Sequence, residues 1–233
     1  MNKKRAKSHK HDDIIKSIFS DRQRTNLLKK QEQTAITWLV QRIPSWITSD
    51  ILTGIGFFGN IIVAGSFVLA AFFHRAYLLL GLLGFIISWF GDSLDGRLAY
   101  YRKIPMKKYG FTLDITIDWI SIIFIGLGYI IYADGIWKLF GYGFVVMYGW
   151  EMIIALIRYR VTGQYTIDSG FLGPTEVRII IGIIMIAEVL LPGSLIYSAG
   201  LVVIVLFLIN IFDTIKVLRV AEEIDKKELK DKS

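Results

Sequence analysis

The feature that most constrains this chain is a series of long apolar runs joined by short polar connections. A helix needs about 20 mainly apolar residues to cross a hydrocarbon core of about 30 Å. Because lipid offers no hydrogen-bond partners, a spanning segment of this length has to be a helix. The sequence therefore predicts an all-α, polytopic integral membrane protein with six transmembrane helices. The predicted spans cover residues 51–73, 76–101, 110–132, 136–157, 175–191 and 194–217.

Positive charge gathers at the ends of these runs. The chain is 54% hydrophobic and yet carries a net charge of +7. Lys and Arg concentrate before the first run and after the second, fourth and last runs, whereas the other connections hold only His74, Arg75 and Lys138. The positive-inside rule then places both termini and these basic segments in the cytoplasm, at the inner membrane if the chain is bacterial. We expect no nucleic-acid partner, because the Lys and Arg residues lie at the ends of apolar runs and not on a soluble domain.

The segment before the first span has an amphipathic pattern. From residue 12 onward, apolar residues recur at helical spacing with Lys, Arg and Gln between them. This pattern predicts one or two helices lying at the membrane surface, and the alternative is an ordinary helix packed on a soluble partner. We therefore divide the chain into a cytoplasmic or interfacial amphipathic arm (residues 1–48), a six-helix transmembrane catalytic domain (49–219) and a charged cytoplasmic tail (220–233).

Four carboxylates lie inside or against the apolar sequence of the second and third spans: Asp92, Asp95, Asp114 and Asp118. One carboxylate at the centre of a span costs about 3 kcal/mol on insertion scales, so four of them need a common reason. The members of each pair are three or four residues apart and therefore share one helix face. Both pairs also fall at the same end of two neighbouring antiparallel helices, beside the basic connection 102–108.

Four acidic groups packed together cannot all stay ionised without counter-charge. Hard divalent cations held by oxygen ligands are the natural counter-charge, and two of them would form a clamp for a diphosphate. Gly96 and Ala99 extend the face of the first acidic pair with almost no side chain, so a ligand can approach the helix backbone there.

These residues resemble the motif of the CDP-alcohol phosphatidyltransferase family, Asp-x-x-Asp-Gly-x-x-Ala-Arg followed after a short spacer by Gly-x-x-x-Asp-x-x-x-Asp. The matching positions are Asp92, Asp95, Gly96, Ala99, Gly110, Asp114 and Asp118. The chain departs from the motif at Tyr100, which stands where the family usually has Arg, and its spacer is longer. Arg97, Arg102 and Lys103 are then the candidates to contact the donor's phosphate in place of that Arg.

The resemblance implies a CDP-alcohol phosphotransferase of phospholipid biosynthesis. Such an enzyme moves a phosphatidyl or phospho-alcohol group from a CDP-linked donor to a hydroxyl acceptor and releases CMP. The resemblance also implies membrane lipids as partners and, because dimers are common in the family, a homodimer. It implies a two-metal site for Mg²⁺ or Mn²⁺ at Asp92, Asp95, Asp114 and Asp118, with Asp118 as the general base. The nucleotide would bind at Asp92, Asp95, Gly96, Ala99 and Gly110.

A second, weaker candidate site opens the fifth span, at Glu176 and Arg178. Either Glu176 favours the helix N-terminus while Arg178 reaches lipid head groups, or both lie near the head group of the donor or acceptor. The preceding Gly173-Pro-Thr-Glu176 resembles a segment of aminoalcohol phosphotransferases. Those enzymes, however, usually carry His after the third Asp, where this chain has Ile115. Glu188 and Asp213 are expected to be structural or simply to lie near the membrane interface.

Besides a structural membrane protein, which would not need this spacing of carboxylates, three functions stay open at this point. CDP-diacylglycerol with a polar alcohol such as inositol phosphate, glycerol phosphate or serine is the favoured pair of substrates. CDP-choline or CDP-ethanolamine with a lipid hydroxyl is the alternative within the same family. A cation transporter that uses the carboxylates is the alternative from another class; it predicts acidic groups near mid-membrane and broken helices in paired positions, whereas here the acids cluster at one end of two spans.

Overall fold

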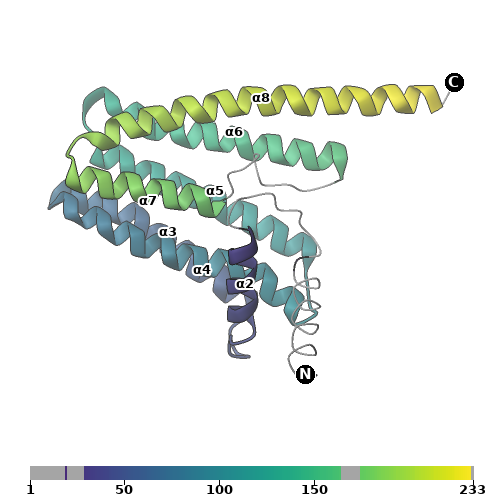
Figure 1. Ribbon diagram of the computed structural model, residues 1–233, viewed down its shortest axis with the longest axis horizontal. Helices are drawn as coiled ribbons and strands as arrows, with labels where there is room; N and C mark the ends of the chain where they lie inside the picture. Colours follow the sequence, from purple (N-terminus) through teal and green to yellow (C-terminus); the bar gives the residue numbers. More distant parts are fainter. Residues whose placement is uncertain (1–18, 20–28, 164–173, 232–233) are drawn as a thin grey trace, which may run out of the picture.

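The structure is a computed structural model that describes residue 19 and residues 29–163 and 174–231. Its described residues form helices and no strands. The helices, labelled as in Figure 1, are α2 (Lys29–Val40), α3 (Ser49–Phe72), α4 (Leu79–Tyr101), α5 (Lys107–Tyr132), α6 (Lys138–Thr162), α7 (Pro174–Leu190) and α8 (Ser194–Asp231), with 3₁₀ turns at Arg75–Leu78 and Gly135–Trp137. The predicted all-α class is confirmed.

Five helical segments in the described part of the chain are long and apolar enough to cross a membrane. They are α3, α4 with its 3₁₀ turn, α5, α6 with its 3₁₀ turn, and α8. The apolar α7 has 17 described residues, a rise of about 25 Å, and begins directly after the undescribed residues 164–173. The polytopic membrane architecture is therefore confirmed, while the sixth span stays a prediction.

Glycines bring α3 and α4 into close contact. A Cβ atom added to Gly91 of α4 would overlap the backbone of Gly56 in α3, and one added to Gly84 would lie 2.7 Å from the carbonyl oxygen of Gly59. In lipid, where apolar burial between helices drives little, small residues of this kind let backbones pack closely. This contact fixes the place of Asp92, the residue after Gly91, relative to α3.

The main apolar core lies at the other end of the bundle from the acidic motif. It includes Val63 and Phe67 of α3, Tyr129 of α5, Met185 of α7 and Leu195 of α8. Beside this core, Glu188 of α7 accepts hydrogen bonds from three groups at or just before the start of α8 and from the Tyr132 hydroxyl. The donors are the Gly193 and Leu195 amides at 3.0 and 2.7 Å, the Ser194 hydroxyl at 3.4 Å and the Tyr132 hydroxyl at 2.8 Å. Glu188 therefore has the structural role expected of it.

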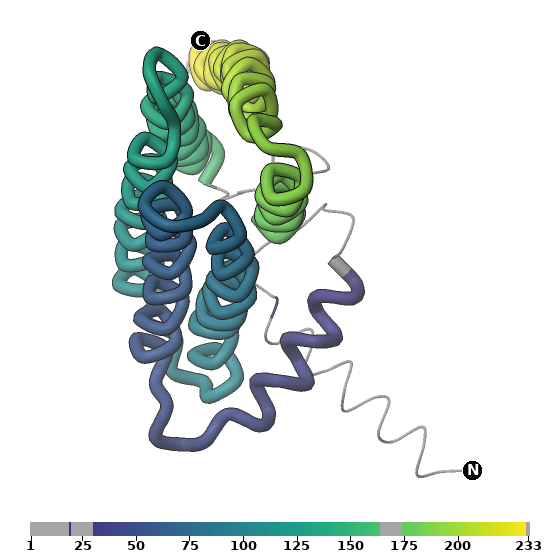
Figure 2. Tube along the Cα trace, turned by 90° about the vertical axis from the view of Figure 1, so that its left-hand side faces the viewer, coloured from purple at the N-terminus to yellow at the C-terminus, as the bar shows by residue number. Residues whose placement is uncertain are grey.

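The arm helix α2 packs against the bundle with its apolar face inward. Ile36 and Val40 are buried against Leu52, Leu94 and Leu98 of α3 and α4. Figure 2 shows α2 running obliquely across the lower end of the bundle, from the neighbourhood of α7 toward the start of α3. The surface-lying arm of the prediction thus has its apolar face on protein, and whether its other face meets lipid stays a prediction.

The last helix, α8, continues without a break through the predicted boundary at residue 219 and reaches Asp231. Figure 1 shows its C-terminal part projecting beyond the end of α6. Arg158 of α6 pairs with Asp213 of α8 at 2.9 Å, which ties the two helices together before α8 leaves the bundle. Asp213 therefore also has a structural partner, as expected.

Candidate active site

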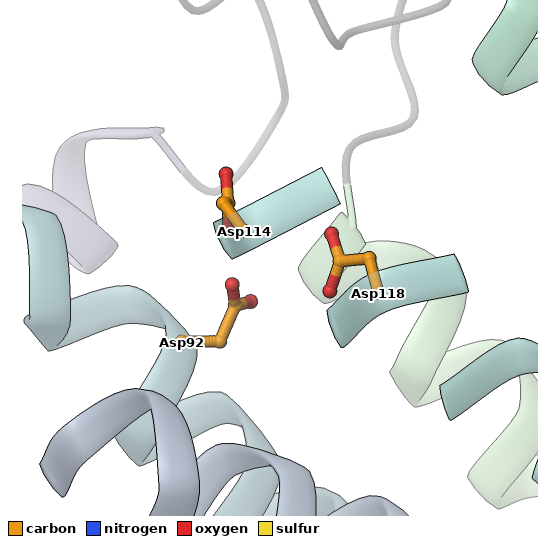
Figure 3. Close-up of side chains that lie close together, drawn as sticks. All are labelled: Asp92, Asp114 and Asp118. Carbon is orange, nitrogen blue, oxygen red and sulfur yellow. The ribbon is translucent and has the colours of Figure 1, made fainter. Parts of the chain in front are cut away.

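Three of the four predicted carboxylates converge. Asp92 of α4 and Asp114 and Asp118 of α5 each offer a carboxylate oxygen, and these oxygens lie within 4.8 Å of one another. In Figure 3 the three side chains point toward a common space. Oxygens bound to one divalent ion at about 2.0–2.6 Å lie within about 5 Å of one another, so the three residues fit a divalent cation.

Asp95 lies beside this group and lines the same cavity. The cavity is formed by α3, α4 and α5, and its lining residues are Thr53, Gly56, Phe57, Asn60, Asp92, Asp95, Asp114, Ile117 and Asp118. The Thr53 hydroxyl donates to Asp95 Oδ2 at 2.7 Å, and the Gly96 amide donates to Asp95 Oδ1. The structure thus gives Asp95 protein donors, and a role for it as a ligand of a second ion stays a prediction.

The start of α3 holds the acidic segment of α4 from one side. The Ser49 hydroxyl donates to the Asp95 carbonyl at 2.8 Å, and Thr53, one turn later, reaches the Asp95 carboxylate. Thr48 caps this helix by accepting from the Ile51 amide at 3.2 Å. Sequence reasoning did not include Ser49 and Thr53 among the site residues, because nothing in their spacing shows that α3 packs against the motif.

Arg178 of α7 also belongs to this site. Its Nη2 lies 2.6 Å from Asp92 Oδ2, and both side chains are largely shielded, with exposed fractions of 16% and 28%. The sequence placed Arg178 among the candidates for a head-group contact but did not predict its pairing with a motif carboxylate. A cation at this position offsets part of the negative charge that the clustered acids accumulate.

The comparison with known proteins bears on this geometry directly. The family model described as CDP-alcohol phosphatidyltransferase matches residues 46–214, which include all four carboxylates and most of the chain. The chain belongs to the CDP-alcohol phosphatidyltransferase family. It is therefore a transferase, and its family implies phosphatidyl transfer from a CDP-linked alcohol in phospholipid synthesis. No curated protein matches the chain.

Two motif glycines of the transferase face open space. Among the described residues, a Cβ atom added to Gly96 or to Gly110 would meet nothing within 4 Å. This differs from Gly91, on the same helix as Gly96, whose Cβ would overlap the backbone of α3. Gly91 is thus needed for packing, whereas Gly96 and Gly110 leave room beside the carboxylates. Ala99, also on α4, is half-buried.

The three basic residues predicted to replace the missing motif Arg lie elsewhere. Arg97 is buried, and its guanidinium carbon lies 4.9 Å from the ring centroid of Phe19. Arg102 donates from Nη1 and Nη2 to the carbonyls of Ile47 and Pro44, at 2.6 and 2.8 Å. Lys103 is exposed in a left-handed conformation, with φ of 60°. None of the three lines the cavity, and Arg178 is the described basic side chain that bonds a cluster carboxylate.

Glu176 is buried in the first turn of α7, with 7% of its surface exposed. The neighbouring Thr175 donates from its hydroxyl to Glu32 Oε1 of α2 at 3.1 Å. The two predicted residues therefore have different surroundings: Arg178 bonds Asp92 of the acidic cluster, whereas Glu176 is buried in the first turn of α7. The bond between Glu32 and Thr175 joins residues far apart in the chain, and no local pattern indicates it.

Proposed function

We propose that this transferase moves the phosphatidyl group of CDP-diacylglycerol to the hydroxyl of a small polar alcohol and releases CMP. Inositol phosphate, glycerol phosphate and serine are the acceptors to test first. The observation that carries the proposal is the convergence of Asp92, Asp114 and Asp118 within 4.8 Å, in a chain of this family. Ile115 after Asp114, where aminoalcohol phosphotransferases usually have His, favours this donor over CDP-choline and CDP-ethanolamine.

In this reaction Asp92, Asp95 and Asp114 would hold divalent metal, and Asp118 would be the general base. Bound Mg²⁺ or Mn²⁺ would neutralise the diphosphate and stabilise charge at the phosphorus. Asp118 takes the proton of the acceptor hydroxyl, whose oxygen forms a bond to the β-phosphorus of the donor. The bond between that phosphorus and the oxygen of the CMP leaving group breaks, and CMP departs with both electrons of that bond. The open space beside Gly96 and Gly110, together with the small side chain of Ala99, would admit the nucleotide.

The active site is proposed to face the cytoplasm. The acidic ends of α4 and α5 lie next to the connection 102–108, which holds four of the chain's Lys and Arg residues, at positions 102, 103, 107 and 108. Basic connections of this kind stay on the cytoplasmic side, where CDP-linked donors and polar acceptors are also available. We also expect the protein to form a homodimer.

The proposal is tested by CMP release. The purified full chain in lipid nanodiscs is mixed with Mg²⁺ or Mn²⁺, CDP-diacylglycerol and each acceptor, and CMP is quantified. Asp118→Asn is expected to lower the rate by about a hundredfold or more, because the acceptor loses its base. Asp225→Asn, in the exposed tail of α8, is the matched control and is expected to react at the rate of the unaltered protein.

The same assay separates the alternatives. Release of CMP from CDP-choline or CDP-ethanolamine with diacylglycerol, but not from CDP-diacylglycerol, would move the enzyme to the aminoalcohol group. The observation in favour of this outcome is the segment Gly173-Pro-Thr-Glu176, which resembles a segment of those enzymes and ends in the buried Glu176. Cation flux through sealed vesicles that depends on Asp114, with no CMP released from any donor, would favour cation transport over the proposed reaction.

A further inference from the structure

The ion pair at the site joins two helices that the arm also joins. Asp92 belongs to α4 and Arg178 to α7, and these helices pack directly on each other farther from the acidic cluster, where Gly182 meets Leu82 and Gly81 meets Met185. At the acidic end, α2 packs on α4 and reaches the first turn of α7 through the hydrogen bond between Glu32 and Thr175. The arm is therefore placed to set the distance across which Arg178 reaches Asp92.

The contact of the arm with α4 is apolar and fully enclosed. Ile36 and Val40 of α2 pack with Leu94 and Leu98 of α4, and none of the four exposes more than 1% of its surface. Leu94 follows Asp92 by two residues, so it points to the opposite side of the helix from the acidic cluster. The arm thus presses on the back of the helix whose front carries Asp92.

The contact of the arm with α7 is polar. Glu32 exposes 5% of its surface and accepts a hydrogen bond from the Thr175 hydroxyl at 3.1 Å. Thr175 precedes Arg178 by three residues, so the two side chains share one face of α7. A buried carboxylate is costly unless it is bonded, so Glu32 is an unexpected choice for a helix that serves only as a surface anchor.

We propose that Glu32 and Thr175 are positioning residues, through which the arm holds the first turn of α7 so that Arg178 reaches Asp92. Because a guanidinium on Asp92 competes with a divalent ion for that carboxylate, the arm would thereby set the metal affinity of the cluster without supplying a ligand. The inference rests on the proposed function in that it takes Asp92 and Asp114 to be ligands of the divalent metal. It adds that a segment outside the motif adjusts their affinity.

The test measures Mn²⁺ binding by electron paramagnetic resonance, on the full chain in nanodiscs and without substrate. Thr175→Val removes the hydroxyl and keeps the side-chain shape, and it is expected to tighten Mn²⁺ binding by about threefold, because Arg178 is held less firmly. Arg178→Gln is expected to tighten it further. In the Arg178→Gln background, Thr175→Val is expected to add nothing, because its effect passes through Arg178.

Thr34→Val is the matched control, since Thr34 is exposed on α2 and its hydroxyl bonds the Lys30 carbonyl in the same helix at 2.9 Å. Glu32→Ala is the second variant and is expected to reproduce Thr175→Val. The inference is overturned if Thr175→Val binds Mn²⁺ as Thr34→Val does. It is also overturned if the effects of Thr175→Val and Arg178→Gln add independently.

A distance measurement checks that the helices move. The chain contains no cysteine, so Gln31→Cys in α2 and Ile179→Cys in α7, both at exposed positions, give two clean sites for spin labels. Thr175→Val is expected to broaden the distance distribution between the labels, and an unchanged distribution counts against the inference. If the coupling to Mn²⁺ holds while no donor yields CMP, only the proposed function fails. If CMP is released and Thr175→Val has no effect on Mn²⁺, only this inference fails.

Discussion

At the scale of single residues, the four motif carboxylates have different surroundings. One carboxylate oxygen each of Asp92, Asp114 and Asp118 lies within 4.8 Å of the other two. Asp92 also forms an ion pair with Arg178. Asp95 instead takes hydrogen bonds from Thr53 and Gly96. Partners that orient a metal-binding carboxylate matter nearly as much as the carboxylate itself. Thr53 is the residue of α3 that has this relation to Asp95.

Thr53→Val is therefore expected to lower CMP release by about tenfold, because Asp95 loses the donor that fixes its orientation. The measurement is the steady-state rate at saturating donor and acceptor, over a titration of Mg²⁺. Thr53→Ser keeps a hydroxyl and is expected to retain most of the rate. Equal rates for the valine variant and the unaltered protein would show that Asp95 does not depend on α3.

At the scale of elements, the seam between α3 and α4 and the junction between α7 and α8 support the site from two directions. Glycines let α4 lie against α3, and Glu188 joins the end of α7 to the start of α8. The amides at a helix N-terminus have no partners within the helix, and a carboxylate is well suited to satisfy them. The position of the acidic face of α4 follows from the first contact, and the position of α7 follows in part from the second.

Gly91→Ala and Gly96→Ala form a matched pair on α4. The first is expected to destabilise the protein by about 1–3 kcal/mol, because the added methyl group overlaps the backbone of α3. The second has open space and is expected to leave the thermal unfolding temperature unchanged or higher, since Ala favours a helix over Gly. It is expected instead to raise the KM for the CDP-linked donor. Thermal unfolding in detergent and donor titrations are the two measurements, and loss of stability in Gly96→Ala would contradict this assignment.

Glu188→Ala is expected to destabilise the protein by about 2 kcal/mol, because it leaves the buried Leu195 amide and the half-buried Gly193 amide without their acceptor. CMP release per folded molecule is expected to stay the same, since Glu188 lies at the other end of the bundle from the carboxylates. The control is Glu222→Ala, which removes a pair with Lys226 whose side chains are 67% and 62% exposed and which contributes little. A specific loss of catalysis in Glu188→Ala, without loss of stability, would contradict a structural role.

At the scale of the whole molecule, the class of fold was predictable because lipid allows few solutions to a long apolar run. The convergence of Asp92 with Asp114 and Asp118 was predictable as well, since helical spacing and the antiparallel arrangement of neighbouring spans bring the pairs together. The partners of Arg97, Arg102 and Arg178 were not predictable. They depend on how α2, α4 and α7 pack, and a long cationic side chain near a motif reaches several places that spacing alone does not distinguish.

The orientation of the molecule in the membrane remains a prediction that single cysteines can test. Lys227→Cys, in the tail of α8, is expected to react with a membrane-impermeant maleimide only from the cytoplasmic side. Ile136→Cys, in the connection before α6, is expected to react only from the opposite side. Since the native chain has no cysteine, each label reports one site. Labelling of both positions from the same side would contradict six spans with cytoplasmic termini.

The uninterrupted course of α8 makes the C-terminal segment a stiff rod. The whole of α8 has 38 residues, which corresponds to a length of about 57 Å, and its part after Val217 accounts for about 20 Å of this length. A fluorophore attached near Asp231 would consequently ride at a fixed height above the bilayer. Energy transfer from it to dye-labelled lipids would report the inclination of the last span, and any ligand that rocks this helix would be amplified into a measurable displacement at its tip.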